Sequence, residues 1–300
     1  MTNKLMKKVF VIILTWNRRE LVVNCLESLK KIKTSHDIQV IVVDNASIDD
    51  TIPYLKKFYP EIKVIKNLRN LGWSGGNNIG IKYAIKNKAD FIILLNNDII
   101  VEKNCIDRLI LGLEKNKPAG IASPKIYRYN TKPPIISNAG NFFNSHYYSH
   151  AKGAGEVDKG QCNKIAYTDF VAGVVCARSE VYKKCGLLDE DYFLYFEDAD
   201  FCVRARKKGY LSVFIQDAVL YHMESATIGM NSPSHTYYNS RNHLLFIKKH
   251  GTFKLLIREL YLAVRLSAKK ILRGSSDGKY FGLGVIDFIL CRFGYRKYWK

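Results

Sequence analysis

Hydrophobic residues in the first half of the chain form short continuous runs, separated by segments in which they recur every three or four positions. The continuous runs cover 8–15, 38–43, 62–65 and 91–95. The segments with helical spacing cover 17–32, 49–59 and 78–86. Runs that are apolar throughout and alternate with amphipathic helices predict an α/β, Rossmann-like fold, with a mostly parallel sheet and helices on both faces.

The pattern becomes less regular in the second half. Residues 127–165 are rich in Tyr, Asn, Gly, Ser and Pro without a clear period, which indicates long loops or short antiparallel strands. Strand-like runs return at 170–177, 211–215 and 219–222, and helical spacing extends from 234 to 272. The end of the chain is therefore expected to be helical.

The balance of charge also changes near the start of the C-terminal helical segment. The sequence has 47 basic and 27 acidic residues, a net charge of +20, and residues 241–300 alone contribute +11. We expect a first domain over 1–232, made of halves at about 1–125 and 126–232, and a basic helical extension over 233–300. Such an excess suggests a polyanionic partner, which is nucleic acid, anionic lipid or a phosphorylated ligand.

The cysteines and the hydropathy exclude other classes of protein. The seven cysteines are odd in number and scattered, without a C-x-x-C pair, which argues against a zinc ribbon or a disulfide scaffold and favours a reducing compartment. No run reaches the roughly 18 apolar residues of a spanning helix, and the start of the chain leads into a strand-like run instead of a cleavable signal. We expect a cytoplasmic protein, either soluble or peripheral at the membrane.

Small polar and acidic residues follow every predicted strand of the first half. In an open parallel sheet, ligands bind beyond the carboxyl ends of the strands. The residues at these ends are Thr15, Asn17, Asp44, Asn45, Asn67, Asn70, Asn96, Asn97 and Asp98. Each is also a common helix or turn cap. Their recurrence after four strands favours a site for a base, a ribose or a metal.

Two features suggest that a phosphate or a phosphate-bound metal could bind at this edge. The glycine-rich stretch 70–80 either forms a simple turn before a helix or lets backbone N–H groups approach a phosphate. Asp98 directly follows an apolar strand, where an unpaired carboxylate is costly. Mg²⁺ or Mn²⁺ bridging two phosphates would offset that cost, and capping a helix over 102–115 is the competing role. His222 becomes a candidate metal ligand if it lies near Asp98.

An acidic segment mixed with aromatic residues follows. Residues 189–200 contain six acidic side chains interleaved with Tyr, Phe and Leu. A solvated acidic face would not carry so many aromatics, whereas a carboxylate at the wall of a pocket, with its pKa tuned to accept a proton, would. Glu197 and Asp198 also begin a predicted helix with basic residues near its end, so part of the pattern is ordinary helix design.

Taken together, these segments resemble the inverting glycosyltransferases of family 2, which have the GT-A fold, and within them the branch that includes rhamnosyltransferases of bacterial cell-surface polysaccharides. The resemblance covers roughly residues 8–250. Its matching segments are Ile12–Asn17, Val42–Ser47, Asn70–Asn78, Leu95–Asp98, Ala172–Gly173, Phe196–Asp200 and Tyr221–His222. Each segment is short, but their order and spacing agree jointly with the family.

The resemblance implies a role for each matching residue. Thr15 and Asp44 would contact the base and ribose. The whole nucleotide-sugar site would comprise Thr15, Asn17, Asp44, Asn45, Asn70, Gly72, Asn78, Asn96 and Asn97. Asp98 matches the last acid of the metal-binding DxD motif, whose first position here is Asn96, and His222 matches an additional ligand for Mg²⁺ or Mn²⁺. Asp198 matches the catalytic base. The acceptor side would comprise Gly173, Glu197 and Asp200.

The resemblance also implies a reaction. Asp198 would remove a proton from an acceptor hydroxyl, whose oxygen would displace the nucleoside diphosphate in line and invert the anomeric carbon. We expect dTDP-L-rhamnose as the donor, with UDP- or GDP-linked hexoses as the alternative. The acceptor would be a cell-surface or lipid-linked glycan.

Three rival interpretations fit less well. A sugar-nucleotide pyrophosphorylase would need a basic glycine-rich loop near its amino end, which residues 15–18 lack. A nucleic-acid-binding protein has only the net charge in its favour, and the carboxylates at the strand ends oppose it. The presence of all the named acids opposes a catalytically inactive relative. We therefore expect no nucleic-acid partner.

The last helical segment suggests a further partner. Residues 255–272 intersperse Leu, Ile and Ala with Lys and Arg, a cationic amphipathic pattern typical of helices in the interface of anionic membranes. The alternative is a helix packed on the catalytic domain with a solvated basic face. Residues 251–300 are expected either to dock at the inner face of the cytoplasmic membrane or to pack on the domain.

Overall fold

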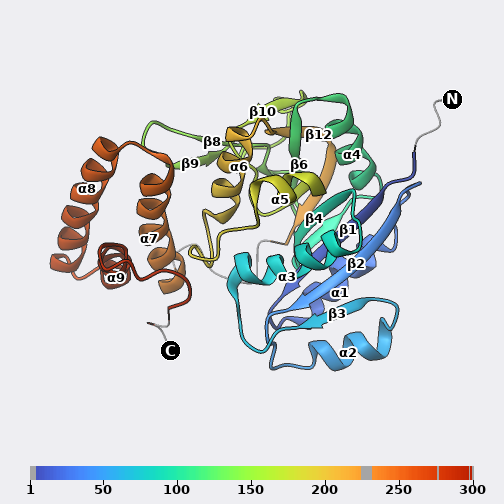
Figure 1. The fold of residues 1–300 in the computed structure, drawn as a ribbon, viewed down its shortest axis with the longest axis horizontal. Helices are drawn as coiled ribbons and strands as arrows, with labels where there is room; N and C mark the ends of the chain where they lie inside the picture. The colour runs from blue at the N-terminus through green and yellow to red at the C-terminus, as the bar shows by residue number, and fades with distance from the viewer. Residues whose placement is uncertain (1–4, 224–231, 276, 297, 299–300) are drawn as a thin grey trace.

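The computed structural model describes residues 5–223, 232–275, 277–296 and 298. In Figure 1 a twisted sheet flanked by helices forms the right-hand part of the molecule, and three C-terminal helices lie on the left. The helices are α1 (Arg19–Leu29), α2 (Thr51–Phe58), α3 (Gly72–Lys86), α4 (Cys105–Lys115), α5 (Ser179–Cys185), α6 (Glu197–Lys207), α7 (Pro233–His250), α8 (Phe253–Leu272) and α9 (Gly278–Ile289). The strands are β1 (Lys8–Thr15), β2 (Asp37–Asp44), β3 (Lys63–Lys66), β4 (Phe91–Asn96), β5 (Ile99–Val101), β6 (Ala119–Arg128), β7 (Ile136–Asn138), β8 (Asn141–Phe143), β9 (Ser149–Ala151), β10 (Ala166–Thr168), β11 (Val175–Arg178) and β12 (Leu211–His222).

The central sheet has the order β10-β12-β6-β11-β4-β1-β2-β3. Its longer ladders, which join β1 to β2 and β4, β2 to β3, and β6 to β12, are parallel. The short strand β11 runs antiparallel between β4 and β6. The expected α/β fold is confirmed, because the fully apolar runs form the parallel strands that are buried on both faces.

Alternate residues of β1 point to the two cores of the protein. Val9, Val11 and Ile13 belong to the core beneath α1, α2 and α4. The intervening residues of β1 join α3, α5, α6 and α7 in the second core. This period of two is invisible in the sequence, because both sets of positions are apolar.

The glycine-rich stretch is helical, contrary to the prediction of a helix that starts near residue 78. The helix α3 begins at Gly72. A Cβ atom on Gly76 would lie 2.4 Å from Leu14, and one on Gly80 would lie 2.6 Å from Ile12. The glycines therefore let α3 approach β1 closely, and this packing outweighs their low helix propensity.

Other boundaries also differ from the prediction, and the run 170–177 forms a strand only over Val175–Arg178. Asn104 is the N-cap residue of α4, and β5 separates this helix from Asp98, so Asp98 does not cap it. The runs 211–215 and 219–222 form one strand, β12, with an irregularity between Ile215 and Val219. The helical segment after residue 234 breaks at Gly251 into α7 and α8.

The C-terminal extension contains α7, α8 and α9, and α7 packs against both other helices. In Figure 1 the helix α7 lies between the sheet and α8. All seven cysteines are free in the structure. Within the described residues, no helix has both the length and the apolar character that a membrane span requires.

Candidate active site

The carboxyl ends of three adjacent parallel strands bring predicted donor-site residues together. Thr15 of β1 is the register partner of Asp44 of β2, and Leu14 is the partner of Asn96 of β4. The amide of Asn97 donates a hydrogen bond to Thr15 Oγ1 at 3.0 Å. Polar groups of β1, β2 and β4 thus form one edge, which we call the donor edge.

The loop after β2 is held at the donor edge by Asn17 and Asp44. The backbone N–H of Ser47 donates to both Asp44 carboxylate oxygens at 3.2 Å. The N–H of Asn17 donates to Ser47 Oγ at 2.6 Å, and Asn17 Oδ1 accepts from the N–H of Ile48 at 2.9 Å. These bonds connect the ends of β1 and β2 and fix the position of the loop.

Asn45 organises the segment between β3 and α3. Its Oδ1 accepts from the amide of Asn67 at 2.9 Å, and its Nδ2 donates to the carbonyl of Gly72 at 2.9 Å and to Asn70 Oδ1 at 3.3 Å. Asn70 Oδ1 also accepts from the N–H of Gly72 at 2.8 Å. Asn45 and Asn70 therefore act together to start α3, and their contact with a donor stays a prediction.

Gly72 and Asn78 connect the glycine-rich stretch to the acidic segment. Gly72 has φ +71°, and a Cβ atom there would lie 2.3 Å from the carbonyl oxygen of Phe193. The buried amide of Asn78 donates to Leu188 O and Glu190 Oε1, both at 2.9 Å, and accepts from the N–H of Leu188 at 3.0 Å. Since the Asn78 amide is engaged in these bonds, its direct role inside the protein is to join α3 to residues 188–190.

Asp98 and His222 lie side by side, as the metal-site hypothesis requires. The strands β5 and β12 pair antiparallel, with Ile99 opposite His222. His222 Nε2 is 3.1 Å from Asp98 Oδ2, whereas Asp98 Oδ1 is buried without a hydrogen-bond partner among the described residues. A carboxylate oxygen without a partner beside an imidazole fits Mg²⁺ or Mn²⁺.

The protein supplies few ligands to such a metal. Within the part of the chain that the structure describes, no cluster of three or more His, Cys, Asp or Glu side chains could hold an ion. A cation at Asp98 would take its remaining ligands from phosphate oxygens and water, as Mg²⁺ commonly does.

A cavity of about 320 Å³ joins Asn96 of the donor edge to Gly173 and Glu197, which are predicted for the acceptor side. Asn96, Gly173 and Asp198 line it. Its other walls are formed by Trp73, Phe143, Ser149, Phe170, Ala172, Leu194, Tyr195, Phe196, Glu197, Ala199 and Asn239. We call this cavity the acceptor pocket. Aromatic rings with a few polar groups suit the apolar faces and hydroxyls of a sugar.

Asp198 is half-buried at the start of α6, at the wall of the acceptor pocket. Its Oδ1 accepts a hydrogen bond from the N–H of Ala199 at 2.7 Å. Burial raises the pKa of Asp198 to about 6, although the N–H groups of Ala199 and Gly173 favour its charged form. A carboxylate whose pKa lies near neutrality is suited to accept a proton.

Glu197 and Asp200 have different environments. Burial, together with the charge of Asp198, raises the pKa of Glu197 well above its ordinary value. Asp200 is buried, yet His250 and Arg204 lower its pKa, each with a nitrogen 2.7 Å from its carboxylate. Asp200 therefore anchors α6 to α7 and, unlike Glu197, does not line the acceptor pocket.

Sequence reasoning missed a clamp on the segment before Asp198. The Asn242 amide donates to the carbonyls of Tyr192, Leu194 and Tyr195 at 2.9, 2.7 and 3.0 Å. The fully buried Arg241 donates to the carbonyls of residues 191 and 192, both at 3.0 Å. The signal available in the sequence was that Arg241 and Asn242, two polar residues, interrupt the apolar helical spacing of 237–247.

The clamped segment has an unusual backbone. Phe193, Tyr195 and Phe196 all have positive φ values, between 62° and 74°. Bulky residues rarely adopt this region, so the segment needs outside support. The carbonyl contacts from α7 supply that support and hold Asp198 at the pocket.

Comparison with known proteins identifies the family to which the chain is similar. A family model described as glycosyl transferase family 2 matches residues 10–171. The chain is 27% identical over 275 residues to a dTDP-rhamnosyl transferase, RfbF, of Shigella flexneri, covering 85% of this chain and 86% of that protein. It is 22% identical over 235 residues to an N-acetylglucosaminyl-diphospho-decaprenol L-rhamnosyltransferase of Mycobacterium tuberculosis, covering 71% of this chain and 76% of the relative.

Two solved structures share the fold. One is a mannosyltransferase of Pyrobaculum calidifontis in complex with GDP-Man and Mn²⁺, with a TM-score of 0.62 and 12% identity over 96% of this chain and 89% of that one. The other is GalNAc-T7 with UDP, GalNAc and Mn²⁺, with a TM-score of 0.61 and 15% identity over 79% of this chain and 48% of that one.

Proposed function

The chain belongs to glycosyl transferase family 2 and is a glycosyltransferase with the GT-A fold, and from this premise we propose that it moves a sugar from a nucleotide-sugar donor to a glycan hydroxyl with inversion. The observation that carries the proposal is the acceptor pocket, where Asn96 of the donor edge and Asp198 line the same cavity. A donor at the strand ends and an acceptor in this pocket would meet beside Asp198.

We propose dTDP-L-rhamnose as the donor, because two relatives that align over most of their length are named rhamnosyltransferases. Thr15 and Asp44 would bind the base and ribose at the donor edge. Asp98 and His222 would hold Mg²⁺ or Mn²⁺, which supplies positive charge to the departing diphosphate. The partnerless oxygen of Asp98 supports this assignment.

In the proposed chemical step, the groups of the protein that act are Asp198 and the walls of the acceptor pocket. Asp198 accepts the proton of the acceptor hydroxyl, and the oxygen attacks the anomeric carbon from the face opposite the diphosphate. The bond from that carbon to the diphosphate oxygen breaks as the new glycosidic bond forms, so the configuration inverts without a covalent sugar–enzyme intermediate. The aromatic walls of the acceptor pocket would orient the acceptor and exclude water.

The acceptor that we propose is a hydroxyl of a cell-surface or lipid-linked glycan. The decaprenol in the name of the Mycobacterium tuberculosis relative supports a lipid-linked acceptor. We further propose that the reaction takes place in the cytoplasm, at the inner face of the cytoplasmic membrane, where such an acceptor would be held.

A screen of nucleotide sugars tests the proposal. The purified chain is mixed with dTDP-rhamnose, UDP-hexoses or GDP-hexoses, with Mn²⁺ or with EDTA, and thermal stabilisation and nucleoside diphosphate release are measured. We expect stabilisation by dTDP-rhamnose with Mn²⁺, since a ligand that binds only the native state raises Tm. Preference for a UDP- or GDP-hexose would support the alternative donor.

Two variants separate the proposed roles. Asp98→Ala should lose the metal-dependent stabilisation, whereas Asp198→Asn should keep it and lose transfer. If no donor stabilises the wild type in the presence of Mn²⁺ or Mg²⁺, the transferase proposal fails. If Asp98→Ala is stabilised as well as the wild type, the metal assignment fails.

A further inference from the structure

The helix α8 exposes a continuous apolar stripe. Its large members, Phe253, Ile257, Tyr261, Val264 and Ile271, are between 47% and 78% exposed. With Ala268, the positions from 253 to 271 are spaced by three or four residues, which places them on one side of the helix. Scattered surface hydrophobics are ordinary, but a contiguous stripe over five turns marks an interaction surface.

Apart from Ile271 at its end, which lies near Gly282 of α9, the stripe is not the face that α8 uses inside the protein. Leu256, Leu260 and Ala263 pack against the core shared with α7 and α9. His146 Nδ1 lies 2.7 Å from the buried Glu259 on the same helix. Since these contacts occupy a different side of α8, the exposed stripe is available to a partner outside the chain.

Basic side chains line one border of the stripe. Lys254, Arg258, Arg265 and Lys269 each directly follow a stripe residue, which places them about 100° around the helix from it. All four are exposed. Among the described residues of 251–296, the acids are Glu259 and Asp287, both buried, and Asp277, which is paired with Lys270. The exposed charge of α8 is therefore cationic.

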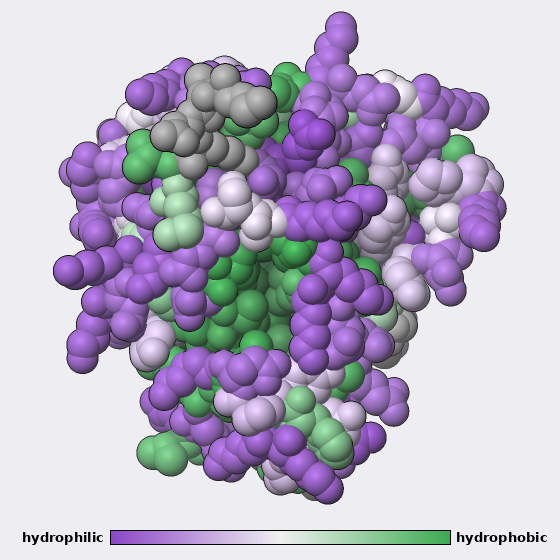
Figure 2. Space-filling model, turned by 90° about the vertical axis from the view of Figure 1, so that its right-hand side faces the viewer, coloured by the Kyte–Doolittle hydropathy of each residue, from purple (hydrophilic) through white to green (hydrophobic). Residues whose placement is uncertain are grey.

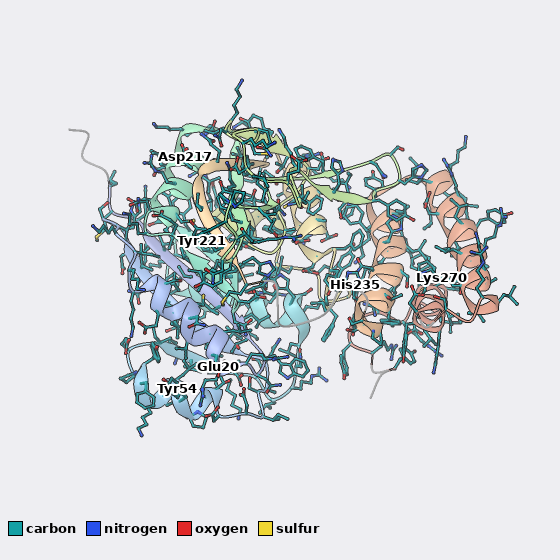
Figure 3. All side chains as sticks on the ribbon, turned by 180° about the vertical axis from the view of Figure 1, so that it is seen from behind. Glu20, Tyr54, Asp217, Tyr221, His235 and Lys270 are labelled. Carbon is teal, nitrogen blue, oxygen red and sulfur yellow. The ribbon has the colours of Figure 1, made fainter. Side chains whose placement is uncertain are left out.

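The opposite side of the molecule has a different character. Figure 2 shows the side of the molecule opposite to the C-terminal helices, which is mostly hydrophilic, with hydrophobic residues gathered in a central hollow. Along the long axis of the molecule in Figure 3, His235 at the start of α7 lies between Tyr221 of β12 and Lys270 of α8. The stripe therefore lies at the end of the molecule that α8 forms.

We propose that α8 lies in the surface of an anionic lipid bilayer, with the stripe inserted among the acyl chains and the basic row on the phosphate headgroups. A cationic amphipathic helix binds such an interface through both kinds of contact. A second copy of the chain is the less suitable occupant, because two stripes facing each other would bring two uncompensated basic rows together. The docking itself does not depend on the proposed reaction; only its purpose rests on the lipid-linked acceptor.

Vesicle flotation of the full chain tests the inference without any readout of transfer. Vesicles of phosphatidylcholine alone are compared with mixed phosphatidylcholine and phosphatidylglycerol vesicles at low and high salt. We expect flotation with the mixed vesicles, which weakens with salt as screening grows. The stripe variant I257S/V264S and the charge variant R258E/K269E should each reduce partition, with a loss of about fivefold for each basic residue removed and more on reversal.

Matched variants elsewhere serve as controls. Phe58→Ser removes a half-exposed ring from α2, and K82E/K86E reverses two exposed lysines of α3. Both should float like the wild type, and circular dichroism should confirm that all variants are folded. Equal partition of the stripe variant and the wild type, or no flotation of the wild type with anionic vesicles, would overturn the proposal. A concentration-dependent dimer that the stripe variant abolishes would instead assign the face to a second copy.

Discussion

Two buried carboxylate oxygens without a hydrogen-bond partner in the described structure, Asp98 Oδ1 and Glu197 Oε2, mark the two sides of the site. Each such group costs about 1–3 kcal/mol, and more when it is charged. Glu197 can relieve the cost by staying protonated, since its pKa is raised. Asp98 lies beside His222, so a cation is the partner that would complete its environment.

The raised pKa of Asp198 predicts an acidic limb in the pH profile. A base must be deprotonated to accept a proton, so kcat/KM should be full above the pKa of about 6 and fall as the pH drops below it. An ordinary aspartate would place this limb near pH 4. Steady-state kinetics between pH 4.5 and 8 would measure it. A profile that stays flat down to pH 5 would contradict a base with this raised pKa.

Substitution of the same residue should separate chemistry from binding. Asp198→Asn keeps the shape but cannot accept the proton, so kcat should fall by roughly 10²–10⁴-fold, with the Kd for the donor nearly unchanged. Asp191→Asn, in the same segment with a half-exposed carboxylate, is the control and should retain activity. Equal loss in both variants would indicate damage to the segment instead of loss of a base.

Gly72 is the point where α3 meets the acidic segment, and Gly72→Ala should destabilise the protein. The new Cβ would lie 2.3 Å from the Phe193 carbonyl oxygen, at a φ of +71°. Left-handed strain costs about 1 kcal/mol and overpacking adds about 1–3 kcal/mol. The control is Gly155→Ala, which has φ +82° but nothing within 4 Å. Denaturant unfolding should show a larger loss of unfolding free energy for Gly72→Ala than for Gly155→Ala. Equal losses would mean that the contact with the Phe193 carbonyl does not contribute.

At the scale of elements, α7 supports the segment before Asp198, the proposed base, and Asn242→Ala should show it. The variant removes three carbonyl contacts from a backbone with positive φ values. We expect kcat to fall at least about tenfold, as misplacement of a catalytic group does, with a smaller change in the KM for the donor.

A further readout distinguishes positioning by Asn242 from general stability. The acidic limb of the pH profile should move, because the burial of Asp198 changes with the segment. Asn116→Ala, which removes one amide contact to the carbonyl of Gly112 at the end of α4, is the matched control and should leave the limb in place. An unchanged limb and kcat in Asn242→Ala would contradict the role of the clamp.

The elements differ in how far the sequence could predict them. The strands at 8–15 and 91–96 could be predicted from their apolar runs, because a parallel strand that is buried on both faces is apolar at nearly every position. The helix over Gly72–Lys86 could not be delimited, since glycines lower local propensity and the compensating approach to β1 is a tertiary contact. The helix over Gly278–Ile289 lies within the extension that was expected to be helical, but its three glycines obscure its bounds, since clear helical spacing ends at 272.

The site shows a similar division. Residues at strand ends, such as Thr15 and Asp44, are predictable because parallel strands bring their carboxyl ends to one edge. The contact between Asp98 and His222 depends on the pairing of β5 with β12, which no local pattern encodes. The clamp by Asn242 depends on the packing of α7 on the segment before Asp198, and this packing is likewise remote in sequence.

For the whole molecule, the distribution of charge has more than one cause. Part of the excess in residues 241–300 serves internal contacts: Arg241 is fully buried, and Lys249 pairs with Asp189. Lys254, Arg258, Arg265 and Lys269 are exposed on α8, and further exposed basic residues lie on both sides of this helix in the chain. The excess in residues 241–300 therefore combines an exposed cationic surface with structural cations, and the rest of the net charge of +20 belongs to residues 1–240.

The catalytic portion and the C-terminal helices should unfold together. Buried side chains of α7 contact the segment before Asp198 on one side, and α9 packs against α7 on the other. A Cβ atom on Gly284 of α9 would lie 2.1 Å from Ser240 Oγ and 2.5 Å from the carbonyl oxygen of Tyr237. Gly284→Ala should therefore push α9 away from α7, at a cost of about 1–3 kcal/mol.

Calorimetry can measure this coupling. If the chain is one cooperative unit, its heat capacity trace has a single peak whose calorimetric and van't Hoff enthalpies agree, and Gly284→Ala lowers the Tm of that whole peak by several degrees. Ile286→Ala, at a half-exposed position of the same helix, should lower it less. Two peaks, with only one shifted by Gly284→Ala, would instead make the extension over 233–300 an independent domain. A single shifted peak would mean that α9 helps to hold Asp198 at the acceptor pocket through α7.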